Sequence, residues 1–225
     1  MTISVEIVKT GYSFVDNDKN IMKANCTCTL VKEGSISVIV DTLTAWDGAF
    51  LLNELEKKGL KPSEITHAIA THGHSDHIGN LNLFTNALHI VGQSVSRQDE
   101  YLLHNFEDQP YKISENIEVI ATPGHTLSDV SIIVKNTALG VVAIVGDLFE
   151  KQEDISNPHV WQVIAGSENE DLQFKNREKI LNSVDYIIPG HGPGFVVTEG
   201  LRGIHKSTKL SALALAVEEP RAEEK

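Results

Sequence analysis

The sequence predicts an α/β fold. Apolar stretches of strand length, rich in β-branched residues, alternate along the chain with longer amphipathic patterns, and short segments with glycine and proline separate them. Four of the predicted strands end in the same way, with an apolar run followed by a histidine or aspartate in a turn of small residues. Strands that end like this can deliver their polar side chains to one edge of a sheet.

Length and composition fit a globular protein with a buried core. The chain has 225 residues, of which 41% are hydrophobic. We predict one domain over residues 1–200 and a tail over residues 201–225, which holds a short helix and then becomes disordered. No apolar run approaches the roughly eighteen residues of a membrane span, and the first residues lack the pattern of a signal peptide. We therefore expect no membrane partner and a location in the cytoplasm, to which the nucleus can be added.

Charge and cysteine content narrow the classes of partner. The formal net charge is −12, so we expect no extended nucleic-acid-binding surface, although a local basic patch is compatible with this charge. The two cysteines, Cys26 and Cys28, are separated by one residue, which is poor geometry for a disulfide between them. We interpret both as packed thiols of a protein from a reducing compartment.

The first half of the chain predicts several strands and one helix. Strands are predicted over residues 3–9, 24–31, 35–41 and 64–71, the second and third forming a hairpin. Asp47 is suited to cap a helix that runs to Lys58, because an apolar side chain pattern follows it. The glycine at position 59 then ends that helix.

The second half continues with short strands and further helices. Strands are predicted over residues 88–91, 117–121, 130–134, 139–145 and 185–188. Helices are predicted over residues 78–84, 172–183 and 210–217. The N-terminus of the first of these helices is expected to face the histidine-rich motif that precedes it, where its dipole favours an anion. Residues 93–110 give no clear pattern, and residues 151–169 predict a loop.

Residues 71–77 read THGHSDH and place three histidines and one aspartate directly after a predicted buried strand. Imidazole and carboxylate groups are ligands that suit zinc, iron or manganese. His72 and His74 are two residues apart, so they point to one side of an extended backbone, whereas Asp76 and His77 follow in the turn. The four side chains thus form two pairs, which predicts two adjacent metal ions.

Three later strand ends repeat this pattern. They carry His125 in the turn Thr-Pro-Gly-His, Asp147 after a glycine, and His191 in the turn Pro-Gly-His-Gly-Pro. Glycine and proline let the backbone turn tightly, so that the side chain projects from the rim of the sheet. Asp147 alone is weak evidence, since a glycine–aspartate pair is common in turns. Taken with the motif at 71–77, the three residues predict one metal centre.

The THGHSDH motif, together with the three later residues, resembles the metallo-β-lactamase superfamily over roughly residues 3–200. The resemblance implies a four-layer αββα sandwich, with two sheets back to back, helices outside and the metal site at one sheet edge. It implies that a first metal ion is held by His72, His74 and His125, a second by Asp76, His77 and His191, and that Asp147 bridges both. After the third histidine many relatives continue with threonine, a small residue and glycine, whereas this chain has residues 126–129, TLSD, so the loop is expected to differ in shape.

The resemblance also implies a chemistry. Di-iron reductases of the superfamily carry a glutamate at the position of His74, so the histidine favours two Zn²⁺ ions, with iron or manganese as alternatives. A metal-bridging hydroxide would attack a carbonyl carbon or a phosphorus atom, and Asp76 would both bind metal and orient the hydroxide. The sequence contains neither a nucleophilic-serine elbow nor a phosphate-binding P-loop. A metal-dependent hydrolase is therefore expected.

The substrate is open at this point. The stretches THGHSDHIGNLNLF, ATPGH, DVSIIV, TALGVVAIVGDLFE and PGHGPGF resemble a small animal member of the superfamily. This narrower resemblance implies an endoribonuclease that acts on histone pre-messenger RNA, with single-stranded RNA as its partner, and a homodimer is compatible with it. Against it, the chain is acidic and has no room for the extra nucleic-acid-clamping domain of the large nuclease relatives.

Three alternatives remain open. The first is a thioesterase resembling hydroxyacylglutathione hydrolase, which would act on a small ester or thioester, although the C-terminal helical domain of that enzyme has no counterpart in this sequence. The second is an iron-dependent oxygenase with a sulfur substrate, which one iron per chain would favour and two zinc ions would exclude. The third is a non-catalytic protein that binds metal, which the complete set of ligands disfavours.

Overall fold

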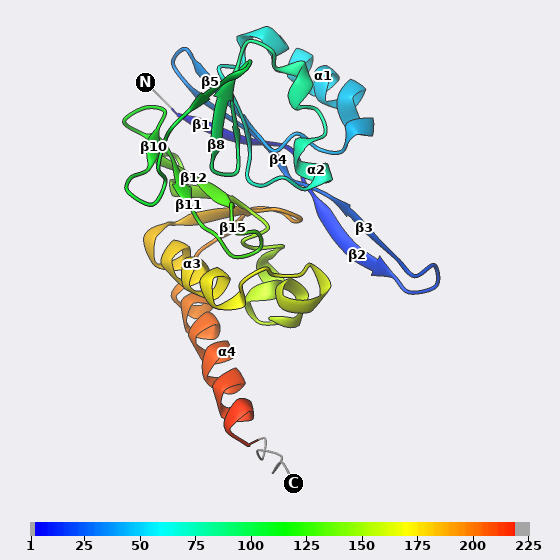
Figure 1. Cartoon of the computed structure of the whole chain (residues 1–225), viewed down its shortest axis with the longest axis vertical. Helices are drawn as coiled ribbons and strands as arrows, with labels where there is room; N and C mark the ends of the chain where they lie inside the picture. Colours follow the sequence, from blue (N-terminus) through cyan, green and yellow to red (C-terminus); the bar gives the residue numbers. More distant parts are fainter. Residues whose placement is uncertain (1–2, 219–225) are drawn as a thin grey trace.

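Two β-sheets pack face to face in the computed structural model, and helices cover their outer faces (Figure 1). The backbone is described for residues 3–218 and the side chains as far as residue 208, so the disorder expected at the end of the tail lies largely outside the described residues. The predicted fold class, an α/β sandwich of four layers, is confirmed. None of the described helices combines the length and the apolar character that a membrane crossing needs.

The first sheet has seven strands in the order β1-β4-β5-β6-β7-β8-β9. They are β1 (Ser4–Lys9), β4 (Cys28–Glu33), β5 (Ile36–Val40), β6 (His67–Ala70), β7 (Leu88–Val91), β8 (Ser94–Arg97) and β9 (Glu100–Leu102). Helix α1 (Gly48–Lys57) lies against the outer face of this sheet (Figure 1). Strands β5, β6 and β7 are parallel neighbours, so their carboxyl ends meet at one edge.

The second sheet has six strands in the order β10-β11-β12-β13-β14-β15. They are β10 (Tyr111–Lys112), β11 (Ile117–Ala121), β12 (Val130–Thr137), β13 (Gly140–Gly146), β14 (Tyr186–Pro189) and β15 (Phe195–Val196). Helix α3 (Glu170–Ser183) covers its outer face, and helix α4 (Glu199–Glu218) packs on α3 (Figure 1). Strands β13 and β14 are parallel, so this sheet also presents two strand ends at one edge.

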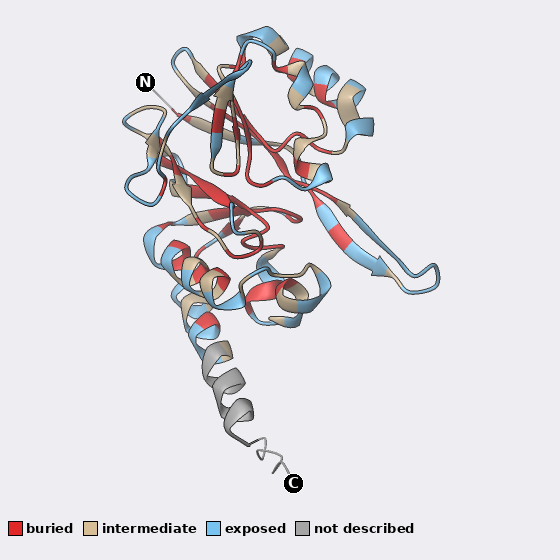
Figure 2. Ribbon diagram, viewed as in Figure 1, coloured by how far each residue is buried: buried red, intermediate tan, exposed pale blue. Residues whose placement is uncertain are grey.

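Side chains alternate between two cores along the central strands. On β12, Ile132 and Val134 face the core between the sheets, whereas Ile133 faces α3. On β5, Val40 faces the core between the sheets and Ile39 faces α1. This alternation explains why these strands are apolar throughout, because both of their faces are covered. Figure 2 shows the buried residues along these strands and along the inner sides of the helices.

A separate hairpin projects from the body of the molecule, formed by β2 (Tyr12–Asp16) and β3 (Ile21–Asn25) (Figure 1). It belongs to neither large sheet, and most of its residues are exposed (Figure 2). Ser13 and Asn25 are the exceptions, since both are buried. The strand predicted over 24–31 is confirmed for residues 28–31, which pair with β5 in the predicted hairpin, but it is wrong for residues 24 and 25, which belong to β3.

The helix predicted over residues 78–84 is also wrong. The helix is α2 (Ser75–Ile78), inside the histidine-rich motif, and only a 3-10 turn (Leu81–Leu83) follows it. The chain leaves the helix at Gly79, whose N–H donates to the Leu43 carbonyl, and a Cβ there would lie 2.3 Å from the backbone nitrogen of Ala45. This close tertiary contact, which the apolar pattern does not reveal, sets the end of the helix.

Other boundaries differ in detail. The region 93–110, which gives no clear pattern in the sequence, holds β8 and β9, and the predicted loop 151–169 contains a 3-10 helix (Gln152–Ile155) and a π-helix (Val160–Ile164). The terminal helix predicted over 210–217 is part of α4, which begins at residue 199. Cys26 and Cys28 are free and fully buried, and burial raises the pKa of both thiols, so they are packed thiols as predicted.

Candidate metal centre

The structure brings the seven predicted ligands together where the ends of strands from both sheets meet. His72 follows β6, His74 precedes α2, and Asp76 and His77 lie in the first turn of α2; His125 follows β11, Asp147 follows β13, and His191 follows β14. Their ligand-type atoms form two groups. We call them the first ligand group (His72, His74, His125 and Asp147) and the second ligand group (Asp76, His77 and His191).

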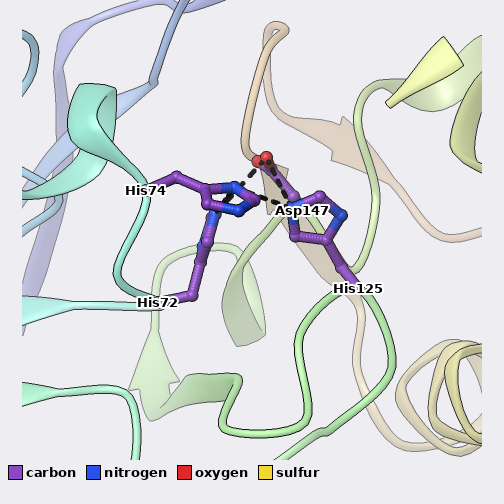
Figure 3. A group of neighbouring side chains, drawn as sticks. All are labelled: His72, His74, His125 and Asp147. Carbon is purple, nitrogen blue, oxygen red and sulfur yellow. Dashed lines mark hydrogen bonds and ion pairs between the residues drawn. The ribbon is translucent and has the colours of Figure 1, made fainter. Parts of the chain in front are cut away.

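The first ligand group surrounds a small volume with three imidazoles and one carboxylate (Figure 3). Nδ1 of His74 lies 2.9 Å from Nε2 of His72 and 3.1 Å from Nε2 of His125. Oδ2 of Asp147 is 3.6 Å from the His72 nitrogen and 3.5 Å from the His125 nitrogen. Four ligands bound tetrahedrally at about 2.1 Å lie about 3.4 Å apart, so these spacings fit one metal ion.

The second ligand group lies on the other side of Asp147. Oδ2 of Asp76 is 3.9 Å from Nε2 of His77 and 3.8 Å from Nε2 of His191. Asp147 reaches this group as well, because its Oδ1 is 3.3 Å from the His77 nitrogen and its Oδ2 is 3.2 Å from the His191 nitrogen. Asp147 therefore contacts imidazoles of both groups, which is the position that a bridging ligand requires.

Unsatisfied polar atoms show that this donor set fits a metal centre. Asp76 Oδ2, His77 Nε2 and Asp147 Oδ1 are buried, yet none has a hydrogen-bond partner among the described residues. Buried polar groups are normally hydrogen-bonded, paired or bound to metal. Nε2 of His77 lies 3.3 Å from Oδ1 of Asp147 and 3.9 Å from Oδ2 of Asp76, so one cation among them would satisfy all three atoms.

Hydrogen bonds on the far side of several rings fix which nitrogen faces the centre. Nδ1 of His125 donates to the Gly166 carbonyl at 2.9 Å, and Nδ1 of His191 donates to the Asn25 carbonyl at 3.0 Å. A ring that donates from Nδ1 carries its free lone pair on Nε2, which is the nitrogen aimed at the other ligands. These two imidazoles are therefore held in the tautomer that binds metal.

His77 is oriented by a carboxylate instead of a carbonyl. Its Nδ1 lies 2.9 Å from Oδ2 of Asp41, and both residues are buried. Asp41 also accepts a hydrogen bond from the backbone N–H of Thr71 at 2.8 Å, so it ties the end of β5 to the end of β6. Asp41 adopts a left-handed backbone conformation, with φ of 56°, which aspartate tolerates better than most residues.

The loop that carries Asp147 is held from behind by α3. Gln173 donates to the carbonyl of Asp147 at 3.1 Å, and Arg177 donates to the carbonyl of Leu148 at 2.7 Å. Arg177 is fully buried; it forms a two-armed ion pair with the equally buried Asp154, and its guanidinium lies over the Phe149 ring. These contacts make the position of Asp147 a consequence of helix packing.

Two glycines allow the close approach of the strand ends. Gly146 has φ of 51°, and a Cβ there would lie 2.2 Å from Oγ1 of Thr71. A Cβ at Gly190 would lie 1.9 Å from Oδ1 of Asp147. The turn before Asp147 thus needs glycine for space and for conformation, whereas the turn before His191 needs it for space.

For His77 and Asp147, burial and the neighbouring charges shift the pKa in opposite directions. Burial, helped by the neighbouring His77, lowers the pKa of His72. Burial would also lower the pKa of His77, but the carboxylates of Asp147 and Asp41 raise it well above its usual value. For Asp147, burial would raise the pKa, whereas the imidazoles of His191 and His77 lower it well below its usual value. These shifts show that the carboxylates and imidazoles of the centre interact strongly with one another.

A cavity of about 240 Å³ opens beside the centre. Its lining includes His74 and Asp76 from the motif, Met22 and Ala24 from the projecting hairpin, and Ala165 from the region after β13. His74 is exposed, so solvent reaches the first ligand group directly. A substrate that enters this cavity would meet the ligand groups on one side and the hairpin on the other.

Sequence reasoning missed two residues of the centre. Glu150 lines the cavity, and its Oε2 lies 4.0 Å from Nε2 of His191. Burial and the nearby Asp147 raise the pKa of Glu150 to about 8. Asp41 is the last residue of a predicted strand, so the pattern that identifies the ligands also marks it, whereas Glu150 lies three residues beyond Asp147 and has no such signal.

Comparison with known proteins places the chain in a class. Residues 23–191 match the metallo-beta-lactamase superfamily. The chain therefore belongs to this superfamily of metallo-hydrolases, as the sequence predicts.

Within the superfamily, the chain is similar to proteins that share one name. The Metallo-beta-lactamase domain-containing protein 1 of Xenopus laevis is 42% identical over 209 residues, which cover 92% of this chain and 87% of the relative. The protein of the same name from Homo sapiens is 41% identical over 163 residues, which cover 71% of this chain and 59% of the relative. The matched part thus spans less than two thirds of the human protein.

A solved structure supports the fold. An N-acyl homoserine lactone hydrolase, with the product N-hexanoyl-L-homoserine bound at its catalytic metal center, superposes with a TM-score of 0.63. The match covers 85% of this chain and 94% of that chain, at 18% identity. At this identity the similarity concerns the fold alone.

Proposed function

We propose that this protein is a metal-dependent endoribonuclease that cleaves single-stranded RNA, with histone pre-messenger RNA as the candidate natural substrate. The observation that carries the proposal is the shared position of Asp147 between the two ligand groups, beside a cavity that a substrate can enter. Two zinc ions are the proposed metals, because nitrogen-rich sites with a carboxylate suit zinc. Such a pair, when bound, activates water and stabilises the charge that develops on a phosphate.

The residues of the chain have distinct roles in this proposal. Asp147 holds the two halves of the centre at a fixed separation, while Asp76, half-buried at the cavity, accepts a hydrogen bond from the attacking water and orients it. The imidazoles of His125 and His191 stay fixed through their Nδ1 hydrogen bonds. A rigid site of this kind lowers the entropic cost of bringing water and phosphate together.

The hairpin gives a reason to prefer RNA over a small thioester. Its exposed Tyr12 and Phe14 rings have centroids 6.0 Å apart, and the Lys23 ammonium lies 5.8 Å from the Phe14 ring. Exposed aromatic rings with nearby cations hold single-stranded nucleic acid by stacking on the bases. Recognition can then be local, as a net charge of −12 requires. A thioesterase resembling hydroxyacylglutathione hydrolase, which would use the same centre, is the alternative.

The test compares three substrates on purified protein of known metal content. Histone pre-messenger RNA, generic single-stranded RNA and an acylglutathione thioester are incubated with the wild type and with His74→Ala, and duplex DNA serves as a control. We expect cleavage of RNA by the wild type alone, poor activity on DNA, and close to two metal ions per chain.

Three results would contradict the proposal. RNA cleavage of equal rate in His74→Ala would identify a contaminating nuclease. Rapid thioester hydrolysis without RNA cleavage would assign the protein to the alternative class. One iron per chain, combined with oxygen consumption on a sulfur substrate, would instead favour the oxygenase.

A further inference from the structure

A buried glutamate extends the second ligand group. Glu150 follows β13 by four residues and is 1% exposed. Its Oε1 has no hydrogen-bond partner among the described residues, and no lysine or arginine described in the structure forms an ion pair with it. A buried carboxylate with an unsatisfied oxygen is costly, and such groups are normally paired or bound to a cation. Glu150 thus has the environment of a ligand.

The geometry places this carboxylate within reach of the same ion as His191. Donor atoms of Asp147, Glu150 and His191 all lie within 4.8 Å of one another, and Glu150 Oε2 is 4.0 Å from His191 Nε2. Two atoms that bind one cation at about 2.1 Å each can be no more than about 4.2 Å apart. The separation of 4.0 Å between Glu150 Oε2 and His191 Nε2 lies within this limit, so one cation can contact both atoms.

The hairpin fixes the direction of the carboxylate. Ser13 of β2 donates a hydrogen bond to Glu150 Oε2 at 3.0 Å, and Lys151 donates to the Ser13 carbonyl at 3.2 Å. A carboxylate oxygen has two lone pairs, so Oε2 can accept from Ser13 and still bind a cation. The backbone N–H of Glu150 is held as well, since it donates to Asp154 at 2.7 Å.

We propose that Glu150 is an additional ligand of the metal ion in the second ligand group, and that this oxygen-rich site favours manganese more than the first ligand group does. With Glu150 and the bridging Asp147, the second site would have three carboxylates and two imidazoles, whereas the first has one carboxylate, that of Asp147, and three imidazoles. Carboxylate ligands suit manganese, while imidazole suits zinc. The proposal rests on the metal centre of the proposed function but not on its substrate.

The test follows the replacement of zinc by manganese in the full chain. Zinc-loaded protein is titrated with Mn²⁺ at fixed free Zn²⁺, and bound manganese is measured by electron paramagnetic resonance and by elemental analysis. In the wild type we expect one site to exchange at lower Mn²⁺ than the other. In Glu150→Gln, the midpoint of that first exchange should rise about tenfold, since one anionic ligand is lost. Ser13→Ala should shift it in the same direction by less.

Controls separate this role from a structural one. Glu153→Gln removes a carboxylate that is exposed on the same loop and should leave both midpoints unchanged. An unchanged midpoint in a folded Glu150→Gln variant overturns the proposal, whatever the protein does to RNA. If Glu150→Gln does not fold, Glu150→Asp decides alone: it keeps the charge but withdraws the oxygens by one methylene, and a midpoint equal to that of the wild type overturns the proposal.

Discussion

The two halves of the metal centre are supported in different ways. On the first sheet, the motif at 71–77 is held by short side chains at neighbouring strand ends, since Asp41 contacts both Thr71 and His77. On the second sheet, the loop with Asp147 is held by long side chains that reach across from α3, above all the buried Arg177. The first support depends on parallel strands that end side by side, and the second depends on the docking of a helix.

This difference teaches where each half is vulnerable. A change at Asp41 acts on one imidazole through one hydrogen bond, so it should disturb metal binding more than folding. Substitution of Arg177 leaves the buried carboxylate of Asp154 without its partner, so it should lower the stability of the fold before it affects metal binding. Asp147, which contacts both ligand groups, is where the two supports meet.

The largest effect is expected from Asp147→Ala. Without its carboxylate, both ligand groups lose an oxygen, and the imidazoles that face it lose the charge that they share. The metal content should fall from about two ions per chain to below one, and RNA cleavage should be lost. Elemental analysis after zinc reconstitution measures this, with His191→Ala expected to empty mainly the second site. Full metal content in Asp147→Ala would show that it does not bridge.

His205→Phe provides the control for that experiment. The His205 ring is buried away from the centre and stacks on Phe174, with ring centroids 4.1 Å apart. A phenyl ring keeps this stacking, so metal content should stay at the wild-type level.

Arg177→Met should destabilise the fold by about 3–5 kcal/mol, because it leaves the carboxylate of Asp154 buried and unpaired. Urea unfolding monitored by circular dichroism measures the change. Lys57→Met breaks the exposed ion pair with Glu54 and should cost less than about 1 kcal/mol. Equal losses in the two variants would mean that the buried pair has no special role in holding the Asp147 loop.

The sequence predicts the site correctly where a residue that can bind metal directly follows a strand. His125 and His191 are readable because each follows an apolar strand and a turn of glycine and proline, which needs no knowledge of the rest of the fold. The projecting hairpin cannot be predicted in this way, because its Tyr12 and Phe14 are apolar yet exposed, whereas the polar Ser13 and Asn25 are buried. Apolar alternation predicts a buried face, and here that face meets solvent.

The residues that hold the ligands in place, and further residues that reach the centre, are harder to predict from the sequence than the ligands themselves. Arg177 appears in the sequence as one charged residue of an amphipathic helix, and its burial follows only from the docking of α3 on the Asp147 loop. Glu150 reaches the centre because the turn after β13 brings it back towards His191, a path that depends on both sheets. Contacts between segments far apart in the chain leave no local pattern.

A smaller effect on the other support is expected from Asp41→Asn. Asparagine tolerates the left-handed backbone at this position, so the fold should persist. Its amide nitrogen can donate to Nδ1 of His77, which would move the ring proton to Nε2 and block the nitrogen that faces the centre. We expect metal affinity at the second ligand group to fall about ten- to a hundredfold, and calorimetric titration with zinc measures it.

Asp185→Asn is the matched control for Asp41→Asn. Asp185 also accepts a hydrogen bond from a backbone N–H, that of Val141, but at the opposite end of the second sheet. Its zinc titration should match that of the wild type. If both variants weaken zinc binding alike, the effect is on general stability and not on the orientation of His77.

The smallest effect is expected at the projecting hairpin. Its exposed side chains, such as Phe14, do not hold either ligand group in place. Phe14 is 50% exposed, so Phe14→Ser should change the free energy of unfolding by no more than about 0.5 kcal/mol. If its ring stacks on a base of the substrate, the KM for single-stranded RNA should rise about fivefold, which corresponds to the lower end of stacking energies of about 1–3 kcal/mol. The KM for a thioester should stay the same.

Tyr101→Ser, at another exposed aromatic ring on β9, controls for a general loss of surface apolarity. An equal KM for RNA in the wild type and both variants would remove the hairpin from substrate binding and, with it, the structural reason to prefer RNA over the thioester.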